Sequence, residues 1–467
     1  MRSKLLLILI TSVNIAAAQN DPIALHPQNP HYFLYRNKPT VLITSGEHYG
    51  AVMNLDFDFT KYLQTLNKDG LNLTRLFTGA TYVEPQGAFN IERNTMAPAP
   101  LKYICPWARS NESGYANGGN KFDLTKWDTA YFSRLKKFMS VARENNVIVE
   151  LTFFCPFYDS LQWKLSPFNN ANNTKHVAGN LERTDIYTIG KNTQAVNELQ
   201  AKLVKKIVTE LNDYDNLMYE LANEPYFGGI TLEWQHFIAT VIDSTEKKLP
   251  KKHLLTQNIA NDNAVIENAD PLVSVFNFHY ASPPVAVSQN YQLNKVIGCN
   301  ETGFKGTSDS VYRLQAWQFI VAGGALFNNL DYSFVAGHED GGFKYPATQP
   351  GGGSVAYRKQ LGYLKDFIYS FDFVKLTPDS AAIKVINAPG VSIQTLAETG
   401  KQYAAHIIGG NNIQLQLALP ANKYKVTWIK PVNGKTISSE MINVHDALTT
   451  LVTPTYQTDI ALRIIKQ

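Results

Sequence analysis

The feature that most constrains this chain is a regular alternation of short apolar runs with longer amphipathic segments. The apolar runs predict buried strands at residues 41–44, 71–77, 147–154, 217–222, 254–259, 273–280, 296–301 and 325–332. Apolar residues return at helical spacing between them, and the predicted helices cover residues 57–69, 128–145, 193–212, 231–248, 312–323 and 355–371. A further helix is expected at 263–269, where the periodicity is poor. Near-continuous apolar strands separated by amphipathic helices predict a parallel sheet whose outer face is covered by helices.

The number of units and the later change of pattern select an architecture. Eight strand–helix units over roughly 350 residues fit an α/β fold, a (β/α)₈ TIM barrel with inserted loops, and a doubly wound sheet is the alternative. After residue 375 only short strand-like runs remain, separated by Gly, Pro and Asn turns. We therefore expect a catalytic barrel over residues 19–375 and a small C-terminal β-sandwich domain over residues 376–467. A structural role for the sandwich is favoured over carbohydrate binding.

The first residues have the pattern of an export signal. Arg2 and Lys4 precede an apolar run that ends in three alanines at 16–18. Residues 1–18 therefore predict a signal peptide and a secreted or periplasmic protein. Gln19 stands where a lipoprotein would have its anchored cysteine, and no later run reaches the ~20 apolar residues of a membrane helix. No membrane span is expected.

Charge and cysteine content exclude several classes of function. The 43 basic and 39 acidic residues leave a net charge of +4, and they are scattered, so no nucleic-acid partner is expected. No histidine or cysteine cluster has zinc-ligand spacing, and we predict neither a metal nor another cofactor. The loop 337–342 could bind calcium, but a solvated loop or a sugar contact is favoured. Cys105 and Cys155 could form a disulfide, or they and Cys299 could be buried thiols. The oligomeric state cannot be predicted.

Two glutamates occupy the positions where barrel enzymes place their chemistry. Such enzymes use the carboxyl ends of the strands, and Glu224 and Glu301 end the fourth and seventh predicted strands. Pro225 stops the strand after Glu224. Both carboxylates should then face one mouth, and a carboxylate pair is the apparatus for hydrolysis of a glycosidic bond. In a retaining enzyme the two groups lie ~5–5.5 Å apart.

These residues and two others resemble a known pattern. It consists of the Asn-Glu-Pro motif, a glutamate ending strand seven, an arginine on strand two and a tyrosine on strand six, here Asn223, Glu224, Pro225, Glu301, Arg75 and Tyr280. The pattern resembles that of the clan A glycoside hydrolases, the superfamily of cellulases and β-mannanases, over about residues 30–372. The chain departs from the family in lacking the frequent tryptophan at the end of strand eight. It also compresses the His-x-Tyr spacing of many cellulases to adjacent residues on strand six.

The resemblance implies a role for each matching residue. Glu224 would be the general acid and base, and Glu301 the nucleophile. Asn223 would bind the sugar 2-hydroxyl group, while Arg75 and Tyr280 would orient Glu301. Proximity to an ionised Glu301 is expected to raise the pKa of Glu224, because two close carboxylates resist double ionisation.

Other polar and aromatic residues at strand ends and on long loops are candidates for substrate contact. They are His279, Glu47, His48, Asp331, Trp107, Tyr158 and Trp163. For the histidine of strand six, a satisfied core position is an equal alternative. Glu47 and His48 could instead cap a loop. Trp107, Tyr158 and Trp163 could instead pack against other loop residues.

The sequence therefore predicts a secreted retaining glycoside hydrolase that cleaves a polysaccharide or oligosaccharide by double displacement. The alternative is a non-catalytic carbohydrate-binding barrel, and a metal-dependent hydrolase on the same fold is disfavoured. The sugar and its linkage are not predicted. Insertions at 79–124 and 155–190 should wall the site, which favours a pocket and exo action or short oligosaccharides.

Overall fold

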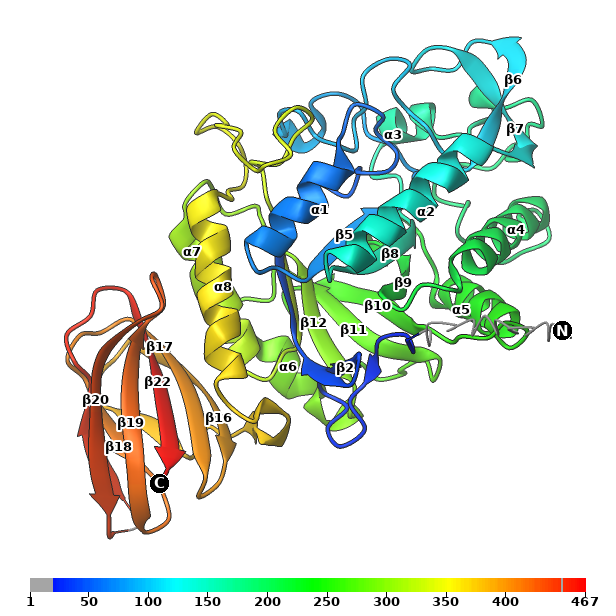
Figure 1. The fold of residues 1–467 in the computed structure, drawn as a ribbon. Coiled ribbons are helices and arrows are strands. Elements are labelled where there is room, and N and C mark those ends of the chain that lie inside the picture. The colour runs from blue at the N-terminus through cyan, green and yellow to red at the C-terminus, as the bar shows by residue number, and fades with distance from the viewer. Residues whose placement is uncertain (1–19, 447) are drawn as a thin grey trace, which may run out of the picture.

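The computed structural model describes residues 20–446 and 448–467, and its largest element is a parallel barrel. The predicted signal peptide lies outside these residues. Eight strands form one sheet in the order β4-β13-β12-β11-β10-β9-β8-β5, which follows the chain around the barrel (Figure 1). They are β4 Leu42–Gly46, β5 Leu73–Phe77, β8 Ile148–Phe154, β9 Leu217–Ala222, β10 Leu254–Asn261, β11 Val273–His279, β12 Val296–Glu301 and β13 Leu326–Leu330. The predicted α/β barrel is confirmed.

The first and last strands of the sheet order, β4 and β5, meet through a side chain. The amide of Asn72, just before β5, donates to the carbonyl of Val41 at 2.8 Å and accepts from the N–H of Ile43 at 2.9 Å. Hydrogen bonds from the Asn72 side chain thus replace some of the backbone hydrogen bonds that would otherwise join β4 to β5. A small antiparallel sheet precedes the barrel and consists of β1 Ala24–Leu25, β2 Phe33–Tyr35 and β3 Lys38–Thr40.

Helices cover the outside of the barrel, as Figure 1 shows. They are α1 Phe59–Lys68, α2 Thr129–Glu144, α4 Gln194–Leu211, α5 Leu232–Glu246, α6 Val285–Asn290, α7 Asp309–Val321 and α8 Val355–Tyr369. Several begin at a side-chain cap, such as Asp58 for α1 and Asp128 for α2, which satisfies free N–H groups of the first turn. The sequence pattern does not predict the short α6.

The helix predicted at residues 263–269 is wrong. This connection between β10 and β11 has no helical residues. The buried side chain of Asn290, at the end of α6, instead accepts from the N–H of Ile266 at 2.9 Å and donates to the carbonyl of Ala264 at 2.8 Å. These bonds fix a non-helical backbone that the weak sequence periodicity does not indicate.

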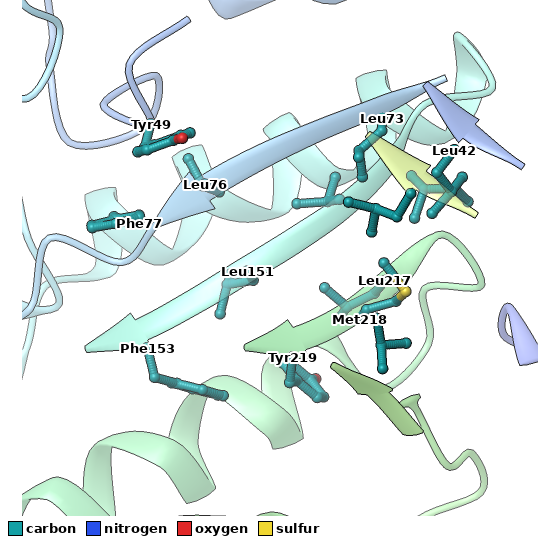
Figure 2. Packing of buried hydrophobic residues seen from close by; sticks show 14 of the residues in the cluster. Leu42, Tyr49, Leu73, Leu76, Phe77, Leu151, Phe153, Leu217, Met218 and Tyr219 are labelled. Carbon is teal, nitrogen blue, oxygen red and sulfur yellow. The ribbon is translucent and has the colours of Figure 1, made fainter. Parts of the chain in front are cut away.

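Buried apolar side chains fill the space between strands and helices. Figure 2 shows neighbouring strands contributing successive residues, including Leu151 and Phe153 from β8 and Leu217, Met218 and Tyr219 from β9. All five are at most 1% exposed. Every residue of these two strands is buried, which explains why their sequences are mostly apolar and do not alternate between apolar and polar residues.

The C-terminal region forms two antiparallel sheets. One has the order β14-β16-β17-β22-β19-β20 and the other β15-β18-β21. The strands are β14 Thr377–Pro378, β15 Ile383–Ile386, β16 Ser392–Glu398, β17 Gln402–Ile408, β18 Gln414–Leu417, β19 Asn422–Lys430, β20 Lys435–Val444, β21 Thr449–Val452 and β22 Asp459–Lys466. No α-helix occurs in the described part of the chain after residue 376. The predicted β region is confirmed, and it has a buried core of its own.

This β region packs beside α7 and α8 (Figure 1), and buried polar groups join it to the barrel. Arg313 of α7 donates to Asp459 of β22 at 2.8 Å, and His406 of β17 lies 3.1 Å from the same carboxylate. Gln318 of α7 also donates to the Ser392 hydroxyl at 2.7 Å. These contacts fasten the β region to α7 on the outside of the barrel and fit the favoured structural role.

The two long insertions carry their own elements. Residues 79–124 contain β6 Trp107–Ser113 and the start of β7 Asn120–Trp127, and residues 155–190 contain α3 Ser160–Leu165. The three cysteines are free and buried, so the alternative without a disulfide is the one observed. Within residues 20–446 and 448–467 we find no helix with the length and apolar character needed to traverse a bilayer.

Candidate active site

A cavity of about 370 Å³ lies at the carboxyl ends of the barrel strands. Glu224 follows β9 and Glu301 ends β12, and both line this cavity. Both side chains are largely buried, with 7% and 6% of their surface exposed. The prediction that these two glutamates face one mouth therefore agrees with their positions.

Three cavity-lining residues have left-handed backbone conformations immediately after strands. The φ angles are 68° at Tyr49, 35° at Glu224 and 53° at Tyr280. Such conformations are unfavourable for residues with a Cβ atom and concentrate at functional sites. Here they turn the chain sharply at the barrel rim, where each residue lines the cavity.

The carboxylate of Glu301 is surrounded by hydrogen-bond donors. The Tyr280 hydroxyl donates to Oε1 at 2.5 Å, and the Tyr49 hydroxyl donates to Oε2 at 2.8 Å. Arg75 donates to the same Oε2 through Nη1 at 3.3 Å. These three donors fix the orientation of the Glu301 side chain. The arrangement suits a carboxyl group that must be held still at the cavity wall.

Arg75 is held in turn by groups deeper in the barrel. It is 1% exposed, and it donates to Glu220 through Nε at 2.9 Å and to Asn223 through Nη2 at 2.7 Å. Nearby Glu150 is fully buried, and burial together with the charge of Glu220 raises its pKa to about 7. One buried cation thus lies among three carboxyl groups, and the raised pKa of Glu150 lets it keep its proton to higher pH than an exposed glutamate would.

Glu224 has a different set of partners. The Tyr158 hydroxyl donates to Oε2 at 2.5 Å, and His279 Nδ1 lies 3.1 Å from Oε1. The Tyr226 hydroxyl reaches Oε1 at 3.4 Å. Asn223 donates to the Tyr158 hydroxyl at 2.8 Å and so positions it. Glu224 therefore contacts a titratable imidazole, whereas Glu301 contacts a permanently charged guanidinium.

The two carboxylates are close together, with His279 beside both. Glu224, His279 and Glu301 each offer an atom within 4.8 Å of the others. The distance from His279 Nδ1 to Glu301 Oε1 is 3.5 Å. These three are metal-ligand types, but tyrosine and arginine donors already occupy the carboxylate oxygens. The absence of a metal remains a prediction.

The pKa values in this triad differ from the sequence-based expectation. Burial lowers the pKa of His279, but the neighbouring Glu301 and Glu224 outweigh it and raise the pKa above its ordinary value. Burial raises the pKa of Glu224, yet the hydrogen bond and charge of His279, with help from Tyr158 and Arg75, lower it on balance. The expectation of a raised Glu224 pKa overlooked this imidazolium.

The structure brings most of the predicted site residues together. Glu224, Glu301, Asn223, Tyr280, Tyr158 and His48 line the cavity. Arg75 and His279 lie directly behind them and contact the glutamates. Both ring nitrogens of His48 are buried without a hydrogen-bond partner, and burial lowers its pKa to about 3, so its neutral imidazole is available to a ligand.

Two predicted contacts, Glu47 and Asp331, serve the scaffold instead. Neither lines the cavity. The carboxylate of Glu47 accepts from the N–H groups of Gly50 at 3.0 Å and Ala51 at 3.2 Å, which fixes the turn after β4. Asp331 is fully buried and accepts from Arg358 of α8 at 2.8 Å. Their predicted role in substrate binding is wrong because other parts of the protein already satisfy both carboxylates.

The tryptophans predicted to stack on sugars also lie outside the cavity lining. Trp107 is 1% exposed, stacks on Trp127 with ring centroids 4.8 Å apart, and donates to the Ala80 carbonyl at 2.9 Å. Trp163 packs against Phe157 at 5.0 Å between centroids. Both tryptophans therefore pack against other loop residues, which was the alternative to sugar stacking. Of the three loop aromatics, Tyr158 lines the cavity.

Sequence reasoning missed several lining residues. Tyr49 is next to His48 at the end of β4, so its place at a strand end was a usable signal. The others lie on loops without periodicity and carried no comparable signal, and they include Tyr82, Glu84, Phe89, Phe227 and Phe304.

Comparison with known proteins identifies the fold. No protein-family model matches the chain, and no curated protein matches its sequence. Solved structures do match in fold, and several of them are described as glycoside hydrolases.

Three of these structures cover nearly the whole chain. The first is a candidate glycoside hydrolase from Bacteroides vulgatus ATCC 8482, with TM-score 0.65, 14% identity, and coverage of 96% of this chain and 83% of that one. A second glycoside hydrolase has TM-score 0.63 and 13% identity, covering 96% and 97%. A glycoside hydrolase family 5 protein from the same Bacteroides has TM-score 0.62 and 12% identity, covering 96% and 93%. At these identities the likeness establishes the fold alone.

Proposed function

We propose that this protein is an exported, retaining glycoside hydrolase that cleaves O-glycosidic bonds of an oligosaccharide or polysaccharide. The observation that carries the proposal is the carboxylate pair. An oxygen of Glu224 and an oxygen of Glu301 lie within 4.8 Å of one another at the rim of a cavity, near the ~5–5.5 Å of retaining enzymes and below the ~6.5–9.5 Å of inverting ones. Export rests on the pattern of residues 1–18.

The first step would be attack by Glu301 on the anomeric carbon. An ionised oxygen of Glu301 forms a bond to this carbon while the bond to the leaving oxygen breaks. Glu224 gives its proton to that oxygen, so the leaving group departs as a neutral alcohol. Arg75, Tyr49 and Tyr280 support this role, since their hydrogen bonds to both oxygens of Glu301 orient it.

In the second step the covalent glycosyl ester would be hydrolysed. Glu224, now ionised, takes a proton from water as the water oxygen attacks the anomeric carbon. The bond to Glu301 breaks, its carboxylate is regenerated, and Glu224 is protonated for the next cycle. Two inversions give net retention.

His279 would govern the proton on Glu224. Its Nδ1 atom lies 3.1 Å from Glu224 Oε1, and its positive charge lowers the pKa of that carboxyl group. We expect His279→Gln to move the alkaline limb of the kcat/KM profile to higher pH, because burial then raises the Glu224 pKa with less opposition. Rate measurements from pH 4 to 9 on an aryl glycoside test this. A shift to lower pH would contradict the assigned coupling.

The proposed activity is tested with a panel of substrates. Wild-type protein should hydrolyse at least one of the 4-nitrophenyl β-glycosides of glucose, mannose, galactose and xylose, or release reducing ends from cellulose, mannan or xylan. A Glu224→Gln/Glu301→Gln double variant, folded by circular dichroism, is the control and should release nothing. Folded wild-type protein that binds these sugars but hydrolyses none would favour the carbohydrate-binding barrel.

A further inference from the structure

The cavity contains a third carboxyl group that the proposed reaction does not use. Glu84 lies on the insertion after β5 and lines the same cavity as Glu224 and Glu301. It is 8% exposed, and its N–H donates to the Met96 carbonyl at 2.9 Å, which fixes the local backbone. This carboxyl group is therefore built into the cavity wall.

The partners of Glu84 are all neutral. The Tyr82 hydroxyl donates to Oε1 at 3.1 Å, and the Asn94 amide donates to Oε2. Within the described chain no lysine, arginine or histidine forms an ion pair with it, in contrast to the pairing of Glu301 with Arg75. Burial, together with the charge of Glu301, raises the pKa of Glu84 to about 8. A carboxyl group with a raised pKa keeps its proton to higher pH than usual, and in that form it can donate a hydrogen bond.

The surrounding wall is apolar. Phe89, Ile91, Met96 and Phe304 line the cavity together with Glu84, and no described lining residue is a lysine or an arginine. Apolar side chains can contact the C–H faces of a sugar ring, while single polar groups bind its hydroxyl groups. Arg75 and His279 already pair with Glu301 and Glu224. A carboxylate-bearing sugar would therefore bring a further anion into the cavity with no lysine or arginine in its described lining to offset it.

We propose that Glu84 is a substrate-binding residue that hydrogen-bonds a hydroxyl group of a neutral sugar unit and disfavours acidic sugars. This deepens the proposed function, because it names the class of sugar that the pocket takes. Glu84 would donate its own proton to the sugar oxygen while Tyr82 and Asn94 donate to Glu84. It takes no part in bond cleavage.

Other titratable groups that interact with Glu84 could also contribute to a pH dependence of binding. They are Glu301, Tyr82, Tyr332 and Cys155. Burial raises the pKa values of Tyr82, Tyr332 and Cys155 above their ordinary values, so all three stay protonated near pH 8. Ionisation of Glu84 above its pKa removes the donor and adds a charge next to Glu301. Sugar affinity should therefore fall as pH rises through 8.

The experiment measures binding rather than turnover, so that it is independent of the catalytic proposal. Methyl β-glycosides of glucose, mannose, galactose and xylose, and methyl β-glucuronide, are titrated into full-length protein at pH 7 and pH 9 by NMR. We expect at least one neutral glycoside to bind, about tenfold more weakly at pH 9 than at pH 7. The glucuronide should bind at least about tenfold more weakly than the neutral sugar.

Three variants complete the test. Glu84→Ala should weaken binding about tenfold at pH 7, through loss of a buried hydrogen bond. Glu84→Gln keeps a donor in the same place, so it should bind within about threefold of wild type and lose the pH dependence. Glu92→Gln, an exposed glutamate on the same insertion, is the control and should behave as wild type.

The results separate this inference from the proposed function. Wild-type affinity in a folded Glu84→Ala protein, pH dependence that persists in Glu84→Gln, or no binding of any neutral glycoside would each overturn the role of Glu84. Hydrolysis could still occur in those cases. Conversely, binding through Glu84 without hydrolysis would support this site while refuting the proposed reaction.

Discussion

Replacing Glu301 with alanine should lower kcat/KM by about 10⁴- to 10⁶-fold on every substrate, as loss of a nucleophile does in other enzymes. Without this carboxylate no covalent glycosyl intermediate can form. The fold should survive, because Arg75 keeps its bonds to Glu220 and Asn223 after the change. The measurement is steady-state hydrolysis of the best aryl glycoside from the panel, with unfolding temperature as the check on structure.

A matched control is available for this variant. Glu267 is an exposed glutamate on the loop after β10, and Glu267→Ala should retain full activity. Azide should rescue Glu301→Ala by occupying the vacated space and attacking directly, giving a glycosyl azide of inverted configuration. Full activity of Glu301→Ala without added nucleophile would remove the proposed mechanism altogether.

Replacing Glu224 with alanine should have an effect that depends on the leaving group. General acid catalysis contributes about 10²- to 10⁴-fold, so a glycoside with a poor leaving group should lose that much. A dinitrophenyl glycoside needs little protonation, and its first step should survive. The second step still lacks its base, so dinitrophenol should appear as a burst while the glycosyl ester on Glu301 accumulates.

Azide again distinguishes the two roles. It needs no general base, so it should restore turnover of Glu224→Ala and yield a glycosyl azide of retained configuration. The contradictory result is the exchange of the two outcomes, with an inverted azide from Glu224→Ala and a retained one from Glu301→Ala. That pattern would reverse the assignment of acid and nucleophile.

The barrel and the pair of glutamates at its rim could be predicted because each leaves a local signature. Strands buried on both faces are mostly apolar, as β8 and β9 are apart from Glu150, Thr152 and Glu220, and amphipathic helices must return apolar residues at helical spacing. Glu224 and Glu301 stand out because polar residues rarely end such strands without a reason. Position along a strand is thus sufficient to place a side chain at the barrel rim.

The position of a residue along a strand does not predict which side chains it contacts at the barrel rim. Asp331 follows β13 directly and Glu301 ends β12, yet Arg358 from α8 pairs with Asp331, which does not line the cavity. Glu84 is the converse case, because its loop has no period and only the folded chain places it in the cavity. The same limit applies to Trp107, whose ring packs on Trp127 rather than facing a substrate.

Proximity of charges also could not be inferred from sequence alone. Two close glutamates predict a raised pKa for the acid, and that expectation holds only if no cation lies between them. His279 contacts both Glu224 and Glu301, and its charge reverses the direction of the Glu224 shift. From the sequence alone, His279 could be either a core residue or a substrate contact. In the structure, its contacts with Glu224 and Glu301 determine the electrostatics of these two carboxyl groups.

Cleavage of a glycosidic bond by double displacement at Glu224 and Glu301 should retain the configuration of the anomeric carbon. Proton NMR of the first sugar released from the best substrate, recorded before mutarotation, tests this mechanism most directly. The anomeric proton of this sugar should show the same configuration as the substrate. A first product of the opposite configuration would contradict it, because a single displacement by water would then have occurred.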